Sequence, residues 1–254
     1  MSERGKKMIR IRELPNGHYM IVSSVSEFCD SMGYCEMRIK HFLKGRKPPQ
    51  TKITIEGTKA HEEEEEYEKE HFEFVPISQE ELADINKDIE FAREDIYTRF
   101  RTEMKYGNKK LSMLIIGRAD KVLRSKGTLI VEDTKYPHNI QKYSEKIEPY
   151  DDQKLQTLLY LNSLFTENDS LNPEDWFLIP HDKKAWIINI KDKKTGESVK
   201  IFRGIQTKIA EEFLNGKLSK FALAVLGINE PEHHKSIKKC LSCRSLSNCE
   251  YKIC

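Results

Sequence analysis

The sequence predicts an α/β protein, in which segments with helical periodicity stand on both sides of a β-hairpin and are followed by two further strands. Apolar residues recur at helical spacing in three segments, residues 23–43, 78–104 and 151–165. Two strand-like runs, 111–123 and 128–136, are joined by a short turn that contains glycine, which is the pattern of a hairpin. A chain of 254 residues can bury one sizeable core, so we expect a single domain, 1–254.

Three helices are expected before the hairpin. The first covers Ser23–Leu43 and has Ser26 as its N-cap. The second covers Thr58–Lys69. The third covers Ser78–Met104, begins with a capping box and directs its apolar residues to the core.

Two strands and two helices are expected after the hairpin, with one loop. The helices are Asp151–Phe165 and Val199–Leu214, and the strands are Asp175–Ile179 and Ala185–Ile190. The polar segment Ile140–Tyr150 is expected to be a loop.

The balance of charges excludes a nucleic-acid site that rests on overall charge, because 43 Lys and Arg stand against 41 Asp and Glu. Such a site needs local basic patches. The segment 37–55 contains no acidic residue, and its cations and those of the C-terminal tail form either such a patch or an ordinary solvated surface. These cations are Arg38, Lys40, Lys44, Arg46, Lys47, Lys52, Lys235, Lys238, Lys239, Arg244 and Lys252.

The composition favours a cytoplasmic protein without a membrane partner. No stretch has the roughly 18 consecutive apolar residues of a membrane span. Met1–Arg12 has no apolar run like that of a secretory signal. Six cysteines in such a chain argue against a secreted disulfide scaffold, because the cytoplasm keeps thiols reduced.

The predicted hairpin carries two aspartates and a lysine that can gather at one metal ion. Asp120 lies on the first strand, whereas Asp133 and Lys135 lie two apart on the second and project from one face. Phosphodiester hydrolysis needs a hard divalent cation held by carboxylates. A lysine beside them can help to deprotonate water or stabilise the charge that builds on the phosphate. The alternative is a surface hairpin with an ordinary salt bridge.

Two further features fit a metal site that acts on nucleic acid. His61, on the helix before the sheet, can give the metal a nitrogen ligand, which suits Mn²⁺ better than Mg²⁺. Gln156 and Tyr160 are four residues apart, so they share one face of their helix and can contact phosphate or base. Each feature is common by itself, and it becomes informative only through its position in the order of the candidate residues along the chain.

The order of these residues resembles the motif series of RecB-type nucleases, which belong to the PD-(D/E)XK class. The series reads His61, Asp120, Asp133-Thr134-Lys135 and Gln156-xxx-Tyr160. The resemblance implies a restriction-endonuclease-like mixed sheet flanked by helices, with the nuclease core in residues 56–215.

The resemblance also implies a role for each motif residue. The metal, Mn²⁺ or Mg²⁺, would be bound by His61, Asp120, Asp133 and the backbone carbonyl of Thr134. Lys135 would be catalytic together with the two aspartates, whereas Gln156 and Tyr160 would position DNA. The chain departs from the family in having Asp in place of Glu before x-Lys, and the adjacent Glu132 leaves that assignment ambiguous by one residue.

Four cysteines form a second candidate site. They are Cys35 and the C-terminal series Cys240-x2-Cys243-x5-Cys249. This pattern resembles the iron-sulfur branch of these nucleases, closest to the CRISPR-associated RecB-like exonucleases. It implies a 4Fe-4S cluster that joins segment 23–45 to segment 232–254. Glu36 stands where that branch usually has proline.

A zinc site is the alternative at the C-terminus. It uses Cys254 in place of Cys35, because Cys-x2-Cys also opens many zinc sites. Cys29 is expected to pack or to face solvent rather than to bind a metal.

The resemblance implies a metal-dependent exonuclease that degrades single-stranded DNA ends, running 5′ to 3′. Its setting would be CRISPR spacer acquisition, with integrase subunits as partners, or DNA repair; an oligomer is compatible with either. An alternative from another class is a non-catalytic iron-sulfur adaptor that binds DNA in an integration complex. A third is a zinc-containing interaction protein with a purely structural hairpin. Asp120, Asp133 and Lys135 argue against the adaptor, because a pure binder does not need this combination.

Overall fold

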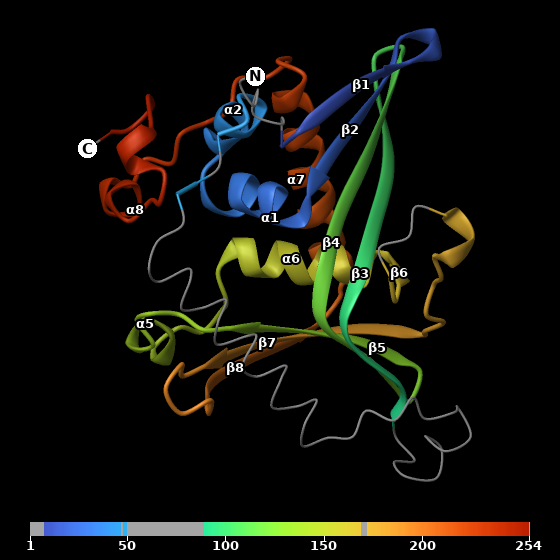
Figure 1. Cartoon of the computed structure of the whole chain (residues 1–254), viewed down its shortest axis with the longest axis vertical. Helices are drawn as coiled ribbons and strands as arrows, with labels where there is room; N and C mark the ends of the chain where they lie inside the picture. The colour runs from blue at the N-terminus through green and yellow to red at the C-terminus, as the bar shows by residue number, and fades with distance from the viewer. Residues whose placement is uncertain (1–7, 47, 50–88, 169–171, 254) are drawn as a thin grey trace, which may run out of the picture.

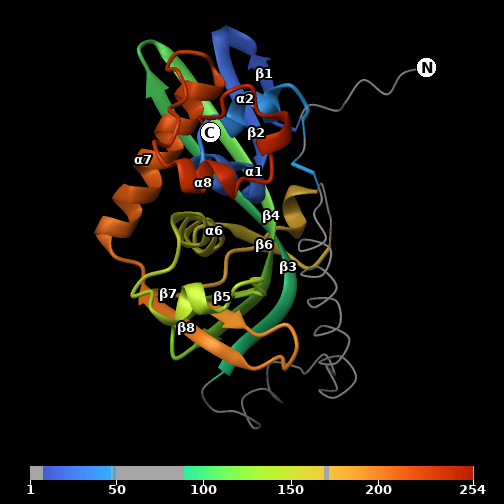
Figure 2. The same ribbon diagram turned by 90° about the vertical axis from the view of Figure 1, so that its left-hand side faces the viewer.

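One mixed β-sheet with helices packed against it forms the described part of the chain (Figures 1 and 2). The computed structural model describes residues 8–46, 48–49, 89–168 and 172–253. Within these residues the sheet has eight strands in the order β1-β2-β4-β5-β7-β8, with β3 beside β4 and β6 beside β3. They are β1 (Arg10–Leu14), β2 (His18–Ser24), β3 (Ile89–Tyr106), β4 (Lys109–Ser125), β5 (Thr128–Lys135), β6 (Leu164–Thr166), β7 (Lys183–Lys191) and β8 (Ser198–Ile205).

The sheet contains both kinds of strand pairing, so the expected mixed sheet flanked by helices is confirmed. β2 pairs with β4 in parallel, and β5 pairs with β7 in parallel. The other pairs, β1–β2, β3–β4, β3–β6, β4–β5 and β7–β8, are antiparallel.

Strand β4 joins the two halves of the sheet. Its residues 111–116 pair with β2, its residues 121–125 pair with β5, and β3 runs beside almost its whole length. Figure 1 shows β3 and β4 as a long twisted hairpin through the molecule. Residues 117–120 of β4 therefore lie where the sheet changes partner from β2 to β5, and Asp120 is at this branch point.

The predicted hairpin of β4 and β5 is confirmed. Thr128 faces Ser125 across the strand pair, so the connection is only two residues long. These residues, Lys126 and Gly127, have φ of +48° and +70°. A two-residue turn with positive φ at both positions matches the twist of the flanking strands, and glycine adopts this conformation without steric cost.

The predicted helix Ser78–Met104 is wrong for the part that the structure describes, because residues 89–106 form β3. Residues 78–88, like the predicted helix Thr58–Lys69, lie outside the described residues. Ile96 and Phe100 are four apart, and a spacing of four fits one face of a strand as well as one face of a helix. Ile96, Thr98 and Phe100 are buried, whereas the residues between them are partly exposed, so the period is two. β4 runs antiparallel to this segment over almost its whole length, so β4 supplies the backbone partners that a strand needs.

The predicted helix Ser23–Leu43 is broken into three pieces. They are α1 (Val25–Cys29), the π-helical turn η2 (Asp30–Tyr34) and α2 (Arg38–Leu43). The N-cap of α1 is Ser24, and not Ser26 as predicted. The hydroxyl of Ser24 accepts the N–H of Glu27, and the Glu27 carboxylate accepts the N–H of Ser24. This capping box fixes the start of the helix directly after β2.

The segments after the hairpin agree with the prediction in part. Helix α6 covers Asp151–Leu161, and β7 contains the predicted strand at 185–190. The predicted strand Asp175–Ile179 is wrong: the turn η3 (Pro173–Asp175) enters it, and Phe177 makes only an isolated bridge to Phe165.

The predicted helix Val199–Leu214 is also wrong in its first half. β8 ends at Ile205, and helix α7 (Lys208–Val225) begins after Thr207, whose hydroxyl accepts the N–H of Ala210. The remaining short elements are η1 (Pro15–Gly17), α5 (Gln141–Ser144) within the predicted loop, α8 (Ile237–Leu241) and η4 (Leu246–Asn248).

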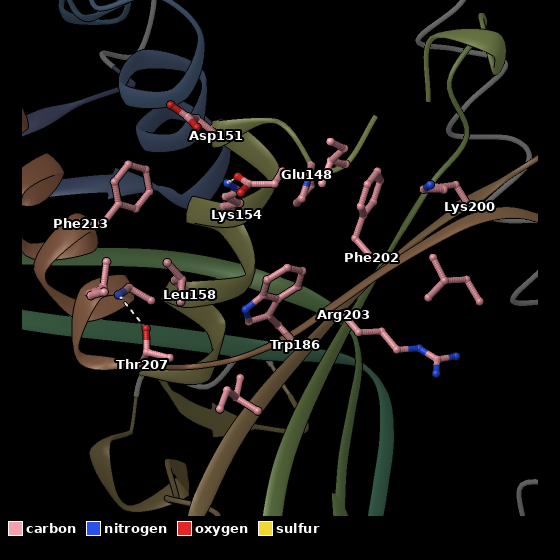
Figure 3. Close-up of a pocket in the computed structure, with 16 residues that line it drawn as sticks. Glu148, Asp151, Lys154, Leu158, Trp186, Lys200, Phe202, Arg203, Thr207 and Phe213 are labelled. Atoms are coloured by element: carbon pink, nitrogen blue, oxygen red, sulfur yellow. Dashed lines mark hydrogen bonds and ion pairs between the residues drawn. The ribbon is translucent and has the colours of Figure 1, made fainter. Parts of the chain in front are cut away.

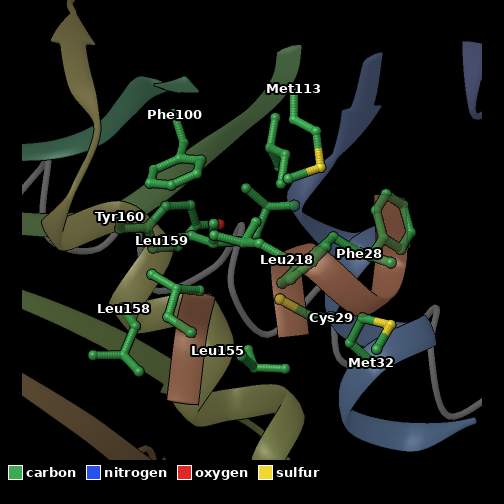
Figure 4. Packing of buried hydrophobic residues seen from close by; sticks show 14 of the residues in the cluster. Phe28, Cys29, Met32, Phe100, Met113, Leu155, Leu158, Leu159, Tyr160 and Leu218 are labelled. Atoms are coloured by element: carbon green, nitrogen blue, oxygen red, sulfur yellow. The ribbon is translucent and has the colours of Figure 1, made fainter. Parts of the chain in front are cut away.

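Helix α6 lies at the centre of the core. In Figure 1 it crosses between the helices α1 and α7 above it and the strands β5 and β7 below it. Leu155, Leu159 and Phe28 are fully buried in one cluster with Leu218 of α7 (Figure 4). Because α6 is packed on several sides, the side chains that it directs to the sheet are held in place.

No helix among the described residues is both long enough and apolar enough to cross a membrane.

We predict that Gly33→Ala destabilises the protein. A β-carbon at Gly33 would lie 2.3 Å from the backbone nitrogen of Asp152, at the first turn of α6. Backbone must then shift, at a cost of about 1–3 kcal/mol in the free energy of unfolding. Chemical denaturation measures this change.

The matched control is Gly216→Ala in the middle of α7, where an added β-carbon meets no atom within 4 Å. Alanine is preferred over glycine inside a helix by about 1 kcal/mol, so this variant should be as stable as the parent or more stable. Equal destabilisation of both variants would contradict the close approach of η2 to α6.

Candidate functional site

Two aspartates and a lysine from β4 and β5 meet at the branch point of the sheet. The Asp133 side chain is fully buried, and its Oδ1 accepts a hydrogen bond from Lys135 Nζ at 2.8 Å. Asp120 Oδ2 accepts the backbone N–H of Thr134 at 2.8 Å. The carboxyl group of Asp120 therefore lies against the backbone that links Asp133 to Lys135.

The structure separates Asp133 from its neighbour Glu132. Glu132 Oε1 accepts a hydrogen bond from Asn189 Nδ2 of β7 at 3.2 Å. Successive side chains of a strand point to opposite faces, so Glu132 points away from Lys135. Asp133 is thus the acidic residue of β5 that stands with Asp120 and Lys135.

Helix α6 completes a continuous chain of hydrogen bonds. Lys135 Nζ donates to Gln156 Oε1 at 3.2 Å, and Gln156 Nε2 donates to the Tyr160 hydroxyl at 3.2 Å. Gln156 and Tyr160 share one face of the helix, as their spacing predicts, and that face is turned to β5. Four of the residues singled out in the sequence, Asp133, Lys135, Gln156 and Tyr160, form one network.

Burial dominates the electrostatics of this network. It raises the pKa of Asp133 to about 7, against the opposing effect of Lys135, and the nearby Asp120 raises it further. Burial by itself would lower the pKa of Lys135, but Asp133 and Asp120 outweigh it and raise this pKa above its ordinary value. Lys135 therefore keeps its proton at neutral pH.

The site fits a divalent cation. Asp133 Oδ2 is buried and has no hydrogen-bond partner among the described residues. Leaving a buried carboxylate oxygen unpaired is unfavourable, and a cation that binds it removes this cost. Oxygen donors of Asp120 and Asp133 are the ligand type that Mg²⁺ and Mn²⁺ prefer.

Asp152, at the start of α6, is a further acidic residue near this network that was not predicted from the sequence. The charge of Asp152 raises the pKa of both Asp133 and Lys135. The pKa of Asp152 itself is raised, mainly by burial and then by the charge of Asp30. Asp152, Gln156 and Tyr160 are spaced by four residues and share one helix face. Extending that spacing one turn backwards would have found it.

His61, the proposed nitrogen ligand, lies outside the described residues. Its place relative to Asp120 and Asp133 stays a prediction.

The segment that contains Tyr34, in the N-terminal part of the chain, contacts the C-terminal segment that contains Lys239. The Tyr34 hydroxyl donates to the carbonyl of Lys239 at 2.7 Å. Burial and the neighbouring Cys243 raise the pKa of Tyr34 to about 12, and Cys35 and Cys240 add to this effect. Three cysteines of the predicted cluster site therefore lie around one ring.

Arg38 connects the same segments. Its side chain is buried, stacks over the Tyr34 ring, pairs with Asp30 at 2.7 Å and donates from Nη2 to Cys243 Sγ at 3.5 Å. Arg38 thus ties the C-terminal cysteine segment to η2 and α2.

The remaining cysteines are Cys29, Cys249 and Cys254. Cys249 follows η4, and its neighbour Glu250 pairs with Lys44 at 3.1 Å and with Arg46 at 2.5 Å. The C-terminal segment thus folds back on the end of α2. Cys29 is buried in the core, as expected, and Cys254 lies outside the described residues.

The cations of segment 37–55 that the structure describes are paired with acidic groups, which favours the alternative of an ordinary surface over a basic patch. Arg38 is buried, Lys40 pairs with Glu230 at 2.6 Å, and Lys44 and Arg46 both pair with Glu250. Lys40, Lys44 and Arg46 pair with acidic groups that follow far later in the chain, which a local count of charges does not reveal. Lys47 and Lys52 lie outside the described residues.

A cavity of about 750 Å³ lies beside α6 (Figure 3). Lys154 and Leu158 line it, each two residues from Gln156 and therefore on the other helix face. Trp186 and Phe202 form part of its wall. No residue of the Asp133–Lys135 network lines this cavity, so the cavity is separate from that network.

The class of protein that this fold and this site define is a metal-dependent nuclease. The chain belongs to the PD-(D/E)XK nuclease superfamily, whose family model matches residues 40–254. A comparison with curated proteins finds no match.

Two solved structures are similar to this chain. The crystal structure of SSO0001 has a TM-score of 0.43 and 16% identity, and the match covers 92% of this chain and 88% of the other. The crystal structure of LHK-Exo in complex with dAMP has a TM-score of 0.40 and 10% identity, covering 81% of this chain and 88% of the other.

We predict that the metal-free protein loses stability as pH rises through about 7. The folded state holds the Asp133 proton more tightly than the unfolded chain, where the pKa is about 3.9. This contribution is complete below the unfolded value and is lost as pH rises through the folded value. Thermal unfolding in chelator at pH from about 5 to 8 measures it.

The control is Asp133→Asn, because an amide does not titrate. Its unfolding midpoint should fall less over the same pH range. The same pH dependence in both proteins would show that Asp133 is ionised in the folded state throughout.

Proposed function

We propose that this protein is a metal-dependent exonuclease that hydrolyses phosphodiester bonds at the ends of single-stranded DNA. Asp120, Asp133, the Thr134 carbonyl and His61 are the proposed ligands of Mn²⁺ or Mg²⁺. The observation that carries the proposal is the fully buried Asp133, with one oxygen on Lys135 and the other without a partner among the described residues.

Backbone geometry supports a place for the Thr134 carbonyl in this ligand set. The Thr134 N–H points to Asp120. In a strand the N–H and C=O of one residue point to the same side, so this carbonyl also faces the Asp120 side. Carboxylate and carbonyl oxygens then approach the ion from two neighbouring strands.

The bound ion supplies an activated water and polarises the phosphoryl oxygen. Lys135, whose raised pKa keeps it protonated, is suited to stabilise negative charge on the phosphate rather than to remove a proton. Gln156 holds Lys135 from the other side, so the ammonium has a fixed position. Tyr160 and Gln156 are the proposed contacts that align the DNA strand.

The proposal of a 4Fe-4S cluster rests on Cys35, Cys240, Cys243 and Cys249. The meeting of the first three around Tyr34 supports it, and thiolates are the ligands of such clusters. The link from Cys35 to Cys240 closes about 205 residues, which constrains the unfolded chain by roughly 5 kcal/mol in an entropy model. We therefore propose a structural role that joins segments 23–45 and 232–254.

The preference for single strands, the 5′ to 3′ direction and a role in CRISPR spacer acquisition or repair are taken from the motif resemblance. Partners such as integrase subunits belong to the same part of the proposal. A non-catalytic adaptor is disfavoured, because a fully buried aspartate without a chemical role would be a cost that a binding protein does not need.

We predict that Asp120→Ala and Lys135→Ala each reduce the rate of Mn²⁺-dependent DNA digestion by about 100-fold or more. Glu132→Ala is the matched control, since it removes the neighbouring carboxylate that faces Asn189. It should retain activity close to that of the parent. If only the Glu132 variant lost activity, Glu132 rather than Asp133 would be the acidic residue that binds the metal.

The substrate is tested by digestion of end-labelled linear and circular single strands with Mn²⁺ or Mg²⁺. We expect the linear strand to be shortened from its 5′ end and the circle to stay intact. Rapid cleavage of circles would establish an endonuclease, and no cleavage of any DNA by correctly folded protein would favour the adaptor.

A further inference from the structure

His233 and His234 lie beside Cys35, and neither histidine belongs to the motifs considered so far. One nitrogen from each ring and the Cys35 sulfur all lie within 4.8 Å of one another. A single zinc ion with bonds of about 2.0–2.3 Å places its donors somewhat closer than this, so only small side-chain movements are needed.

The histidine rings have free nitrogens for a metal. His234 Nδ1 is buried and has no hydrogen-bond partner in the part of the chain that the structure describes. His233 Nδ1 contacts the carbonyl oxygen of His234, and a carbonyl can only accept. Nδ1 of His233 therefore carries the proton and Nε2 the lone pair, which is the usual arrangement of a metal-binding histidine.

The backbone N–H groups of Met37 and His234 donate to the Cys35 sulfur. Burial raises the pKa of the Cys35 thiol, and these two hydrogen bonds oppose that rise only in part. The same loop that presents His234 thus supports the sulfur.

Glu36 anchors this loop. Its carboxylate accepts the backbone N–H of Glu232 at 3.0 Å and pairs with Lys220 at 2.9 Å. Lys220 also pairs with Glu232 at 2.8 Å. Glu36 occupies the position where the iron-sulfur branch usually has proline. A proline side chain could bind neither the Glu232 N–H nor the Lys220 ammonium. The residue that departs from the family pattern is therefore the one that anchors the loop with the two histidines.

We propose that Cys35, His233 and His234 form a binding site for a single Zn²⁺-type ion. Sulfur and imidazole donors select zinc over magnesium or calcium. Three protein donors leave a fourth position to water, which is typical of exchangeable rather than closed zinc sites. Binding releases the Cys35 proton.

This ion and the cluster exclude each other, because both require the Cys35 sulfur. This mutual exclusion depends on the proposed cluster. The proposed zinc site does not depend on the cluster. Zinc would occupy the protein that has not received or has lost its cluster.

Co²⁺ is the probe for the site, because a cobalt–thiolate bond gives a charge-transfer band that carboxylate sites do not give. Metal-stripped, reduced, full-length protein is titrated with Co²⁺ and then with Zn²⁺. We expect a band that saturates at one equivalent and that Zn²⁺ removes. The His233→Ala/His234→Ala double variant should lose this band, and His181→Ala should keep it.

Glu36→Gln is a second variant, since it preserves size but weakens the anchor; it should weaken Co²⁺ binding without abolishing the band. Circular dichroism checks the fold of each metal-free variant. A full band in the double histidine variant would overturn the proposal and assign the ion to the C-terminal cysteines.

The exclusion is tested by anaerobic cluster reconstitution, followed by the brown visible absorbance. Pre-bound Zn²⁺ should block reconstitution in the parent but not in the double histidine variant. Equal reconstitution of the parent with and without Zn²⁺, after a normal Co²⁺ titration, would contradict the shared sulfur and leave the zinc site standing. DNA digestion depends on Asp120 and reports on the nuclease proposal independently.

Discussion

The ion pair between the buried Asp133 and the partly exposed Lys135 is the interaction on which the rest of this site depends. An aspartate with no exposed surface is unfavourable unless cations neutralise it, and Lys135 neutralises only one of its oxygens. The second oxygen, Asp133 Oδ2, has no partner among the described residues, so a further positive charge next to Asp120 is needed to neutralise it. A metal ion would meet that need, and we propose that the same burial that raises the pKa of Asp133 to about 7 favours cation binding there.

The fold brings these groups together through the branch in β4. Because β4 changes partner from β2 to β5 near Asp120, the carboxyl group of Asp120 meets the backbone of Thr134 at the position where the ladder of backbone pairs with β5 ends. Helix α6 is held by core packing on several sides and directs Gln156 onto Lys135. The core thus determines the positions of the polar groups of the site.

The parts of this arrangement that depend on local chemistry could be predicted from the sequence. The hairpin turn at Gly127, the shared face of Asp133 and Lys135, and the shared face of Gln156 and Tyr160 follow from short-range geometry. The strand β3 could not be assigned from a spacing of four residues, because that spacing fits both a helix and a strand. The partners of Lys44 and Arg46 come from near the C-terminus, so only the folded chain reveals that these cations are neutralised.

The meeting of the chain ends is a second consequence of long-range contacts. Tyr34 and Arg38 gather cysteines from both ends, and Glu36 holds the histidine loop beside them. Sequence spacing indicates the cysteines but not the histidines, since His233 and His234 have no motif of their own and acquire a role only through their position.

We propose above all that Asp120 and Asp133 bind one divalent ion together. Crystals grown with Mn²⁺ and measured at the manganese absorption edge test this most directly. We predict one anomalous peak within bonding distance of both carboxylates and close to the Thr134 carbonyl. Fully bound manganese elsewhere, with Lys135 still the only cation at Asp133, would contradict it.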